Sequence, residues 1–281
     1  LAVSRRHASD KLIKYVGQSE PVDSTLVIFE RSDSFATIRI NPPEPYDLLS
    51  RDMTLALTQR FKNLNSQPDL RTVILVGVAD NSFCDETDGA EIPKLADAEV
   101  SEAARARQGL YDEIENCPIP VIAAIRGSAA GAGIELALAC HLRIASPDTT
   151  FSFGQIGSDG IETSGRLARL KRQIRSDYAT EIIRTRRTVP AAEALRIGLI
   201  NRIAPEDQLL LEAESLARLI STMAPLAIRA GLEAVTRGTE LPLAEGLALE
   251  SNLFANLFAT SDVREGTSAF LEKRKPVFKG R

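Results

Sequence analysis

The chain has 281 residues, of which 44% are hydrophobic, and a formal net charge of −4. This length and hydrophobic content allow one large domain or two smaller ones with a sizeable core. The weakly acidic balance lacks the basic surface typical of nucleic-acid binding, and no apolar run reaches the ~18 residues needed to span a bilayer. Neither a nucleic acid nor a membrane is therefore expected as a partner.

The cysteines and histidines also exclude classes of site. Cys84, Cys117 and Cys140 are odd in number and lack the spacing of metal ligands, so reduced, buried thiols and no metal site are expected. His7 lies in a polar N-terminal segment and His141 begins a predicted strand. A Ser-His-Asp triad is disfavoured, because neither histidine is in a favourable place for one.

The N-terminal 23 residues are polar and show no apolar period, which predicts an extension outside a folded core spanning 24–200. The chain begins with Leu instead of Met. We expect a cytoplasmic protein. The alternative is an organelle matrix, if Arg5, Arg6 and His7 belong to a trimmed transit sequence.

The first elements of the core are a predicted hairpin and a predicted helix. Two β-rich runs at 25–31 and 35–40 are separated by a short polar turn, which is typical of a hairpin. Ser50 is a predicted N-cap for a helix over 51–65. This helix has apolar residues on one face: Met53, Leu57, Phe61 and Leu64.

Strands and helices then alternate, which predicts an α/β fold with a largely parallel sheet. The expected strands are 72–78, 120–125, 142–146 and a short one near 150–153. The expected helices are 99–116 and 132–140, and residues 79–88 are expected to be a loop.

The β signal nearly vanishes after residue 165. Helical patterns cover 166–184, 190–197, 206–222, 225–237, 242–259 and 262–273. Residues 201–281 are thus predicted to be an all-helical region. Such a region rarely builds a core of its own and often packs onto a neighbouring subunit.

The most informative segment is a predicted strand that runs through a glycine-rich turn into a helix. The turn has glycine at 127, 131 and 133, and Glu135 follows in the first turn of the helix. Such a turn lets the backbone approach a ligand, and the free N–H groups and helix dipole suit a developing negative charge. With one carboxylate beside them, this arrangement predicts a site that stabilises an oxyanion or enolate and moves a proton.

The segment 119–145 resembles the central motif of the crotonase (enoyl-CoA hydratase/isomerase) superfamily. The segments 83–88, 195–203 and 266–279 resemble three further motifs of the same superfamily, in the same order. The resemblance implies an α/β fold: a crotonase-like ββα superhelix followed by a helical oligomerisation region at 201–281. It also implies a homotrimer, or a hexamer built as a dimer of trimers.

The resemblance assigns roles to residues of both loops. The backbone N–H groups of Thr87 and Ala132, the latter beside Gly131, match the family's oxyanion hole for a thioester oxygen. Glu135 matches a catalytic glutamate that acts as general acid or base. No cofactor is implied, since coenzyme A enters as part of the substrate.

Two departures from the family pattern concern the chemistry. Counting from Phe151 places Gln155 where hydratases have a second glutamate, and Gln is neither an acid nor a base. Asp159 or Glu162 of the altered loop could replace that glutamate.

The first loop departs as well, since it carries Asp85, Glu86 and Asp88, with Glu86 in place of a glycine. Extra carboxylates beside an anionic coenzyme A are unhelpful unless a basic group compensates them. Arg126, Lys94, Lys273 and Lys275 are candidate cations, and Phe270 with Lys273 are the nearest matches to the family's nucleotide contacts.

These observations favour an acyl-CoA-processing enzyme of enoyl-CoA hydratase/isomerase type, a lyase or isomerase. The alternative is a CoA-independent hydrolase that cleaves a carbon–carbon bond of a β-diketone, of the 6-oxocamphor hydrolase type, because that enzyme has a similar acidic first loop. A second alternative is a non-catalytic scaffold with this fold, motivated by the missing second glutamate. Binding of coenzyme A thioesters separates the first reading from the second.

Overall fold

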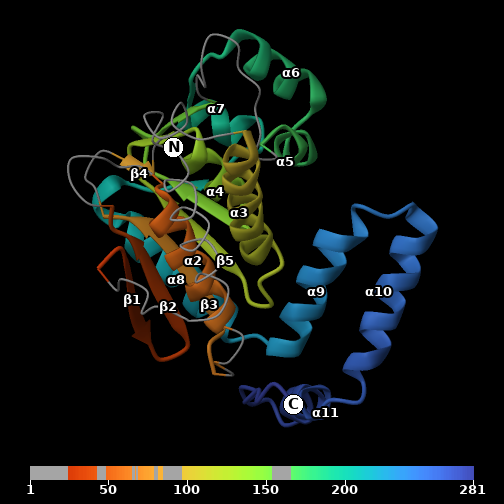
Figure 1. Ribbon diagram of the computed structural model, residues 1–281. Coiled ribbons are helices and arrows are strands. Elements are labelled where there is room, and N and C mark those ends of the chain that lie inside the picture. The colour runs from red at the N-terminus through yellow and green to blue at the C-terminus, as the bar shows by residue number, and fades with distance from the viewer. Residues whose placement is uncertain are drawn as a thin grey trace, which may run out of the picture.

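The structure is a computed structural model that describes residues 25–42, 49–64, 67, 69–78, 82–84, 97–153 and 166–281, with the backbone alone at 97–103 and 166. Strands and helices alternate in the N-terminal two-thirds, and the C-terminal third is helical (Figure 1). The predicted extension at 1–23 lies outside the described residues.

The chain enters the described part through the predicted hairpin. Strands β1 (Val27–Ser32) and β2 (Phe35–Ile40) pair antiparallel, with Ser32 opposite Phe35 at the turn. Helix α2 (Arg51–Leu64) follows, and the Ser50 hydroxyl accepts a hydrogen bond from the Met53 N–H at 3.2 Å. The predicted cap is therefore confirmed, as is the buried face with Met53 and Phe61.

Among the described residues, the main sheet has six strands in the order β1-β2-β3-β5-β7-β10. Its members after the hairpin are β3 (Thr72–Gly77), β5 (Val121–Ile125), β7 (Leu142–Ala145) and β10 (Arg202–Ile203), all parallel to their neighbours. Side chains of β3 alternate between two cores, Val73 and Leu75 on one face and Ile74 and Val76 on the other. Burial on both faces explains why these strands read as continuous apolar runs.

Helices cover both faces of this sheet. Helix α2 and helix α3 (Asp97–Glu115) lie against one face, and α8 (Leu209–Ser221) packs on the other through Leu209, Ala213 and Ala217 (Figure 1). Although α8 belongs to the segment predicted to be a separate helical region, it shares a core with the sheet.

A second sheet has four short strands in the order β4-β6-β8-β9. They are β4 (Ser82–Cys84), β6 (Ser128–Ala130), β8 (Thr150–Ser152) and β9 (Val189–Pro190). The prediction of a loop at 82–84 and of a turn at 128–130 is wrong, because a strand of three residues has too few positions to show a period. Three successive turns, β3-β4-α3, β5-β6-α4 (Ala132–Ala139) and β7-β8-α5 (Arg166–Gln173), each place one strand in each sheet and then a helix, which confirms the ββα superhelix.

The helix predicted over 166–184 is two helices, α5 (Arg166–Gln173) and α6 (Ser176–Thr185). Arg175 between them has an extended backbone, and Ser176 and Asp177 open α6 with the residue types favoured at helix starts. Shorter elements follow: α7 (Ala191–Arg196) and the 3-10 turn η3 (Glu206–Gln208).

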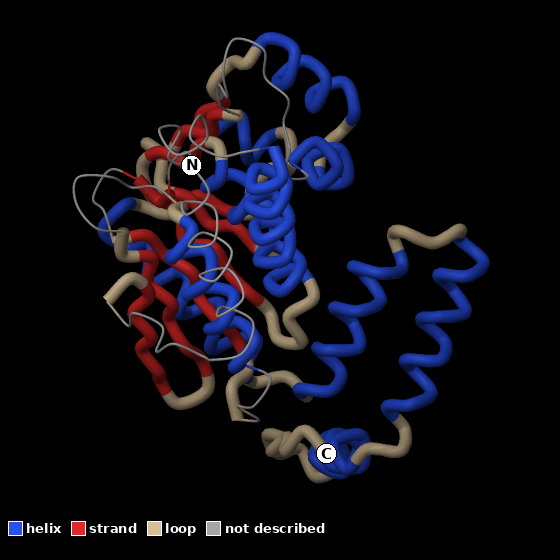
Figure 2. The backbone as a smooth tube through the Cα atoms, viewed as in Figure 1, coloured by secondary structure: helices blue, strands red, loops and turns tan. Residues whose placement is uncertain are grey.

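The last helices extend away from the two sheets as a separate arm (Figure 2). They are α9 (Pro225–Gly238), α10 (Leu243–Leu257) and α11 (Ser261–Leu271). No residue of α9 or α10 is buried within the chain. Among the helices that the structure describes, none is long and apolar enough to cross a membrane.

Candidate active site

The predicted strand–turn–helix unit is present, and its glycines shape the start of helix α4 (Ala132–Ala139). Gly127 and Gly131 have positive φ angles of 65° and 48°, a conformation that residues with a Cβ rarely adopt. The Gly131 N–H donates to the Ser152 carbonyl at 3.2 Å. Ala132 is the first helical residue, so its N–H has no acceptor inside the helix.

Gly133 lets α4 touch the second sheet. A Cβ added there would lie 1.8 Å from the carbonyl oxygen of Cys84, the last residue of β4. The first turn of α4 therefore packs directly against the backbone at the end of β4. Thr87, Asp85, Glu86 and Asp88 themselves lie outside the described residues.

Glu135 lies in the first turn of α4 and is 1% exposed. All other residues of this helix are Ala, Gly, Ile or Leu, so Glu135 is its one ionisable side chain. Burying a carboxylate is costly unless it is hydrogen-bonded. The buried Tyr111 lies close enough for the charge of Glu135 to act on its hydroxyl.

Tyr111 was not among the residues singled out from the sequence. It comes from α3, is 0% exposed, and its hydroxyl also lies 3.4 Å from the Ala132 carbonyl oxygen. Burial raises the pKa of Tyr111 well above its usual value, and the charges of Glu135 and Cys84 raise it further against an opposing effect of Arg107. A tyrosine next to the apolar residues of this helix was the signal in the sequence that could have pointed to Tyr111, since a tyrosine hydroxyl that becomes buried normally has a hydrogen-bond partner.

Two of the other predicted site residues, Phe270 and Lys273, lie far from Glu135 within one chain. Phe270 is near the end of α11 and Lys273 follows that helix, and α11 lies far from α4 (Figure 1). Phe270 is 82% exposed. Arg126 follows β5 and forms an ion pair with Glu206.

Gln155, Asp159 and Glu162, proposed at or in place of a second catalytic glutamate, lie outside the described residues. The same is true of Lys94.

The cysteines and His141 have structural surroundings. Cys84, Cys117 and Cys140 form no disulfide and are buried, as predicted. His141 Nδ1 accepts the Val121 N–H at 2.9 Å, and Nε2 lies 3.1 Å from the Glu115 carbonyl oxygen. This ring joins α3, α4 and β5, and both of its nitrogens are occupied by backbone groups.

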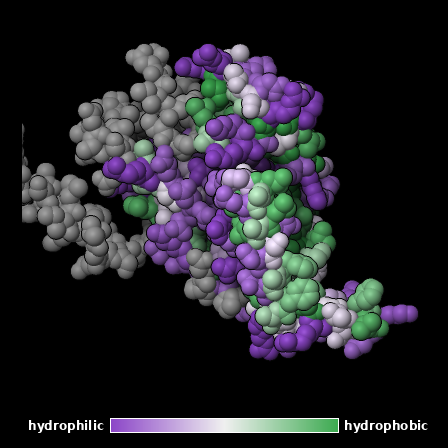
Figure 3. All heavy atoms as spheres, turned by 90° about the vertical axis from the view of Figure 1, so that its right-hand side faces the viewer, coloured by the Kyte–Doolittle hydropathy of each residue, from purple (hydrophilic) through white to green (hydrophobic). Residues whose placement is uncertain are grey.

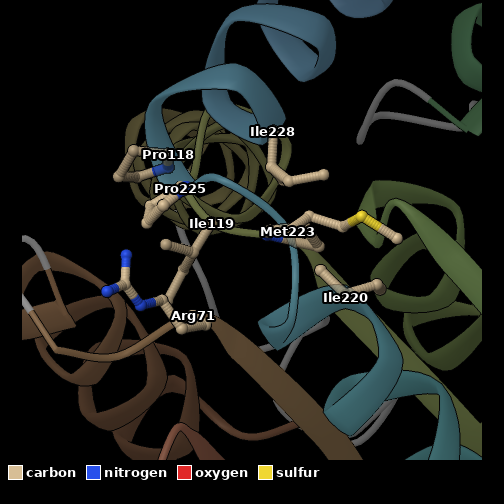
Figure 4. A pocket seen from close by; sticks show the side chains of 8 residues that line it. Arg71, Pro118, Ile119, Ile220, Met223, Pro225 and Ile228 are labelled. Atoms are coloured by element: carbon tan, nitrogen blue, oxygen red, sulfur yellow. The ribbon is translucent and has the colours of Figure 1, made fainter. Parts of the chain in front are cut away.

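An apolar hollow elsewhere in the chain is not part of this site. It lies where α9 leaves the core, and its lining comes from the ends of α8 and α9 and the segment before β5 (Figure 4). The lining residues are Arg71, Pro118, Ile119, Pro120, Ile220, Met223, Pro225 and Ile228. None of them belongs to α4 or β4.

Comparison with known proteins defines the class to which this chain belongs. Residues 30–281 match the family model for enoyl-CoA hydratase/isomerase. The chain belongs to this family.

Similar proteins share most of their length with this chain. A Bacillus subtilis protein that carries an enoyl-CoA hydratase/isomerase name is 38% identical over 250 residues, 89% of this chain and 96% of its own. A crotonyl-CoA hydratase of Syntrophomonas wolfei is 32% identical over 252 residues, covering 90% of this chain and 97% of its own. The crystal structure of an enoyl-CoA hydratase from Bacillus anthracis superimposes with a TM-score of 0.87 at 31% identity, covering 91% of this chain and all of the other.

Proposed function

We propose that this chain processes acyl-CoA thioesters by stabilising an enolate, with Glu135 as the general acid and base. The observation that carries the proposal is a carboxylate, 1% exposed, one turn from the Ala132 N–H, where Gly133 presses α4 against the end of β4. The S. wolfei relative, named a crotonyl-CoA hydratase, supports a thioester substrate. No further cofactor is proposed, because coenzyme A is part of the substrate.

The proposed chemistry requires one oxyanion hole and one proton carrier. The N–H groups of Ala132 and Thr87 would hold the thioester oxygen as charge develops on it, and losing one such donor costs on the order of 3 kcal/mol in barrier. In hydration, Glu135 takes a proton from water as the water oxygen bonds to the β-carbon. The enolate then takes that proton at its α-carbon, and the carboxylate is restored.

Isomerisation needs the same oxyanion hole and the same proton carrier. Glu135 would remove a proton from the α-carbon of a 3-enoyl-CoA and return it at the γ-carbon, with the enolate oxygen held in between. This reaction needs no second carboxylate, so it suits a chain with Gln155 at the position of the second glutamate. Asp159 and Glu162 are the proposed replacements if the chain hydrates.

The test is turnover of crotonyl-CoA and of a 3-enoyl-CoA by the wild type and by Glu135→Gln. The variant should lose at least ~100-fold in kcat with an unchanged melting temperature, because it retains shape but not proton transfer. Glu245→Gln is the matched control, since Glu245 is also in the first turn of a helix but is exposed. Full activity of Glu135→Gln would refute the role of Glu135.

Ligand binding separates the remaining readings. Acetoacetyl-CoA should raise the melting temperature by mass action, and a cyclic β-diketone should not. A shift with the diketone alone would favour the CoA-independent hydrolase. Binding of thioesters without turnover, in an intact assembly, would favour the scaffold.

We also propose that the chain assembles as a homotrimer or as a dimer of trimers. An apolar stripe on α10 is exposed: Leu243, Leu247, Phe254 and Phe258. Hydrophobic side chains gather on this face of the molecule (Figure 3). Exposed apolar area of this kind is typical of an interface. A partner copy would also offer the Phe270 and Lys273 of its own α11 to the coenzyme A.

A further inference from the structure

The chain after α11 folds back along that helix and is held there by two of its carboxylates (Figure 1). The Asp262 carboxylate, in the first turn of α11, accepts the N–H groups of Lys279 and Gly280, each at 2.8 Å. The Glu265 carboxylate, about one turn further along, accepts the Val277 N–H at 2.7 Å. Asp262 is only 4% exposed. The chain therefore follows a fixed path beside α11.

The turn that begins this path has a lysine where glycine is usual. Lys273 has a φ angle of 54°, in the left-handed region that residues with a Cβ rarely adopt. Its N–H donates to the Phe270 carbonyl at 3.2 Å, and the Arg274 N–H donates to the Ala269 carbonyl at 3.0 Å. This pair of hydrogen bonds is the Schellman ending of a helix, in which the left-handed residue is most often glycine. Glycine would therefore serve the turn better, so the lysine side chain needs a reason outside the turn.

Arg274 is held in place by two carboxylates. Its guanidinium makes a bidentate pair with Glu265, at 2.6 Å and 2.9 Å, and its Nε donates to Glu272 at 2.6 Å. The hydrogen bonds from Arg274 and Val277 lower the pKa of Glu265 to about 2, so this carboxylate is ionised at neutral pH. Exposed ion pairs contribute little on their own, but a bidentate pair within a network of charges and backbone donors holds one geometry. The residue that follows Lys273 is thus fixed against the helix.

The turn displays two exposed side chains, one aromatic and one cationic. Phe270, in the last turn of α11, is 82% exposed. Lys273 is also exposed, and it forms no ion pair with any residue that the structure describes, in contrast to Arg274. Aromatic side chains stack on nucleic-acid bases, and a lysine ammonium attracts phosphate. The nucleotide end of coenzyme A carries both a base and phosphates.

We infer that Glu265 and Arg274 are positioning residues: they hold the left-handed turn that presents Phe270 and Lys273 to the nucleotide end of a coenzyme A thioester bound by a neighbouring copy of the chain. This inference rests on the proposed function, and it adds the nucleotide end to the parts of the substrate that the enzyme recognises. Such a contact is the same in the ground state and in the transition state. Its loss therefore raises KM and leaves kcat unchanged.

The first test compares KM for crotonyl-CoA with KM for crotonyl-pantetheine, which has the same thioester but no nucleotide. In Glu265→Gln, KM for crotonyl-CoA should rise by about tenfold, roughly the value of one contact with a charged group. The kcat values and KM for crotonyl-pantetheine should stay as in the wild type. An unchanged KM for crotonyl-CoA, or an equal rise for both substrates, would overturn the inference.

Glu214→Gln is the matched control for this comparison. Glu214 pairs with Arg218 on α8 at 2.7 Å, and its side chain is 25% exposed, as is that of Glu265. Removing this pair should change KM for neither substrate.

Lys273→Gly separates the turn from the side chain. Glycine favours the left-handed conformation, so the melting temperature should not fall, yet KM for crotonyl-CoA should rise by about tenfold. An unchanged KM in this variant would also overturn the inference.

A wild type that turns over neither substrate would instead refute the proposed function. Calorimetric titration with acetoacetyl-CoA and acetoacetyl-pantetheine then decides the inference without turnover. Equal affinity of the wild type and both variants for acetoacetyl-CoA would overturn it, and weaker binding of acetoacetyl-CoA alone by the variants would support it.

Discussion

The contact between Gly133 and Cys84 predicts that one methyl group disables the site. A Cβ at residue 133 would lie 1.8 Å from the Cys84 carbonyl oxygen and 2.6 Å from its carbonyl carbon. Because non-bonded heavy atoms pack at roughly 3.5 Å, Gly133→Ala must move α4 and β4 apart by more than about 1 Å. Both sides of the contact are backbone, so no side-chain rotation relieves it.

Overpacking of this kind typically costs 1–3 kcal/mol of stability, and a displacement of about 1 Å at a catalytic group can cost on the order of 100-fold in rate. We therefore expect Gly133→Ala to lower kcat/KM on crotonyl-CoA by about 100-fold. The melting temperature should fall as well, but the protein should remain folded. The control is Gly231→Ala in α9, where an added Cβ meets nothing within 4 Å. Wild-type kcat/KM in Gly133→Ala would refute the view that this contact sets the oxyanion hole.

Two further predictions concern stability and assembly. Burial lowers the pKa of His141 to about 4, so the folded state keeps the ring neutral while the unfolded chain protonates it below about 6.5. The contribution of His141 to the free energy of unfolding is therefore fully present above pH 6.5, and it falls by about 1.4 kcal/mol per pH unit as the pH is lowered toward 4. Urea unfolding of His141→Gln should lack this slope, and an equal slope in both proteins would contradict it. Phe254→Glu, on the exposed stripe of α10, should give a smaller species by light scattering without unfolding, and an unchanged mass would argue against that face as an interface.

Much of the fold could be predicted because its elements carry local signals. The hairpin, α2 with its Ser50 cap and the buried strands β3 and β5 agree with the predicted ranges. The long apolar runs and the periodic helices have enough residues for a pattern to emerge. Strands β4 and β6 do not: each has three residues, and each is defined by its neighbours in the second sheet.

The candidate site likewise has one part that local sequence signals predict and another part that only the packing of the fold creates. The strand–turn–helix unit and Glu135 lie in one continuous segment, so glycine spacing and one carboxylate in an apolar helix were enough to find them. The close approach of Gly133 to Cys84 joins residues 49 positions apart (133 − 84), and no local pattern marks it. The break between α5 and α6 was missed because a helical period continues across Ile174 and Arg175.

The sequence by itself determined the family, the alternation of strands and helices, and the carboxylate that begins α4, because each is written in short-range spacing. Only the tertiary structure decided that α8 belongs to the core, that α9 and α10 bury nothing within the chain, and that Tyr111 lies close to Glu135. Tyr111 and Glu135 are 24 residues apart (135 − 111) on different helices. A proximity of that kind exists only after the sheet has set both helices side by side, so it follows from packing and not from periodicity.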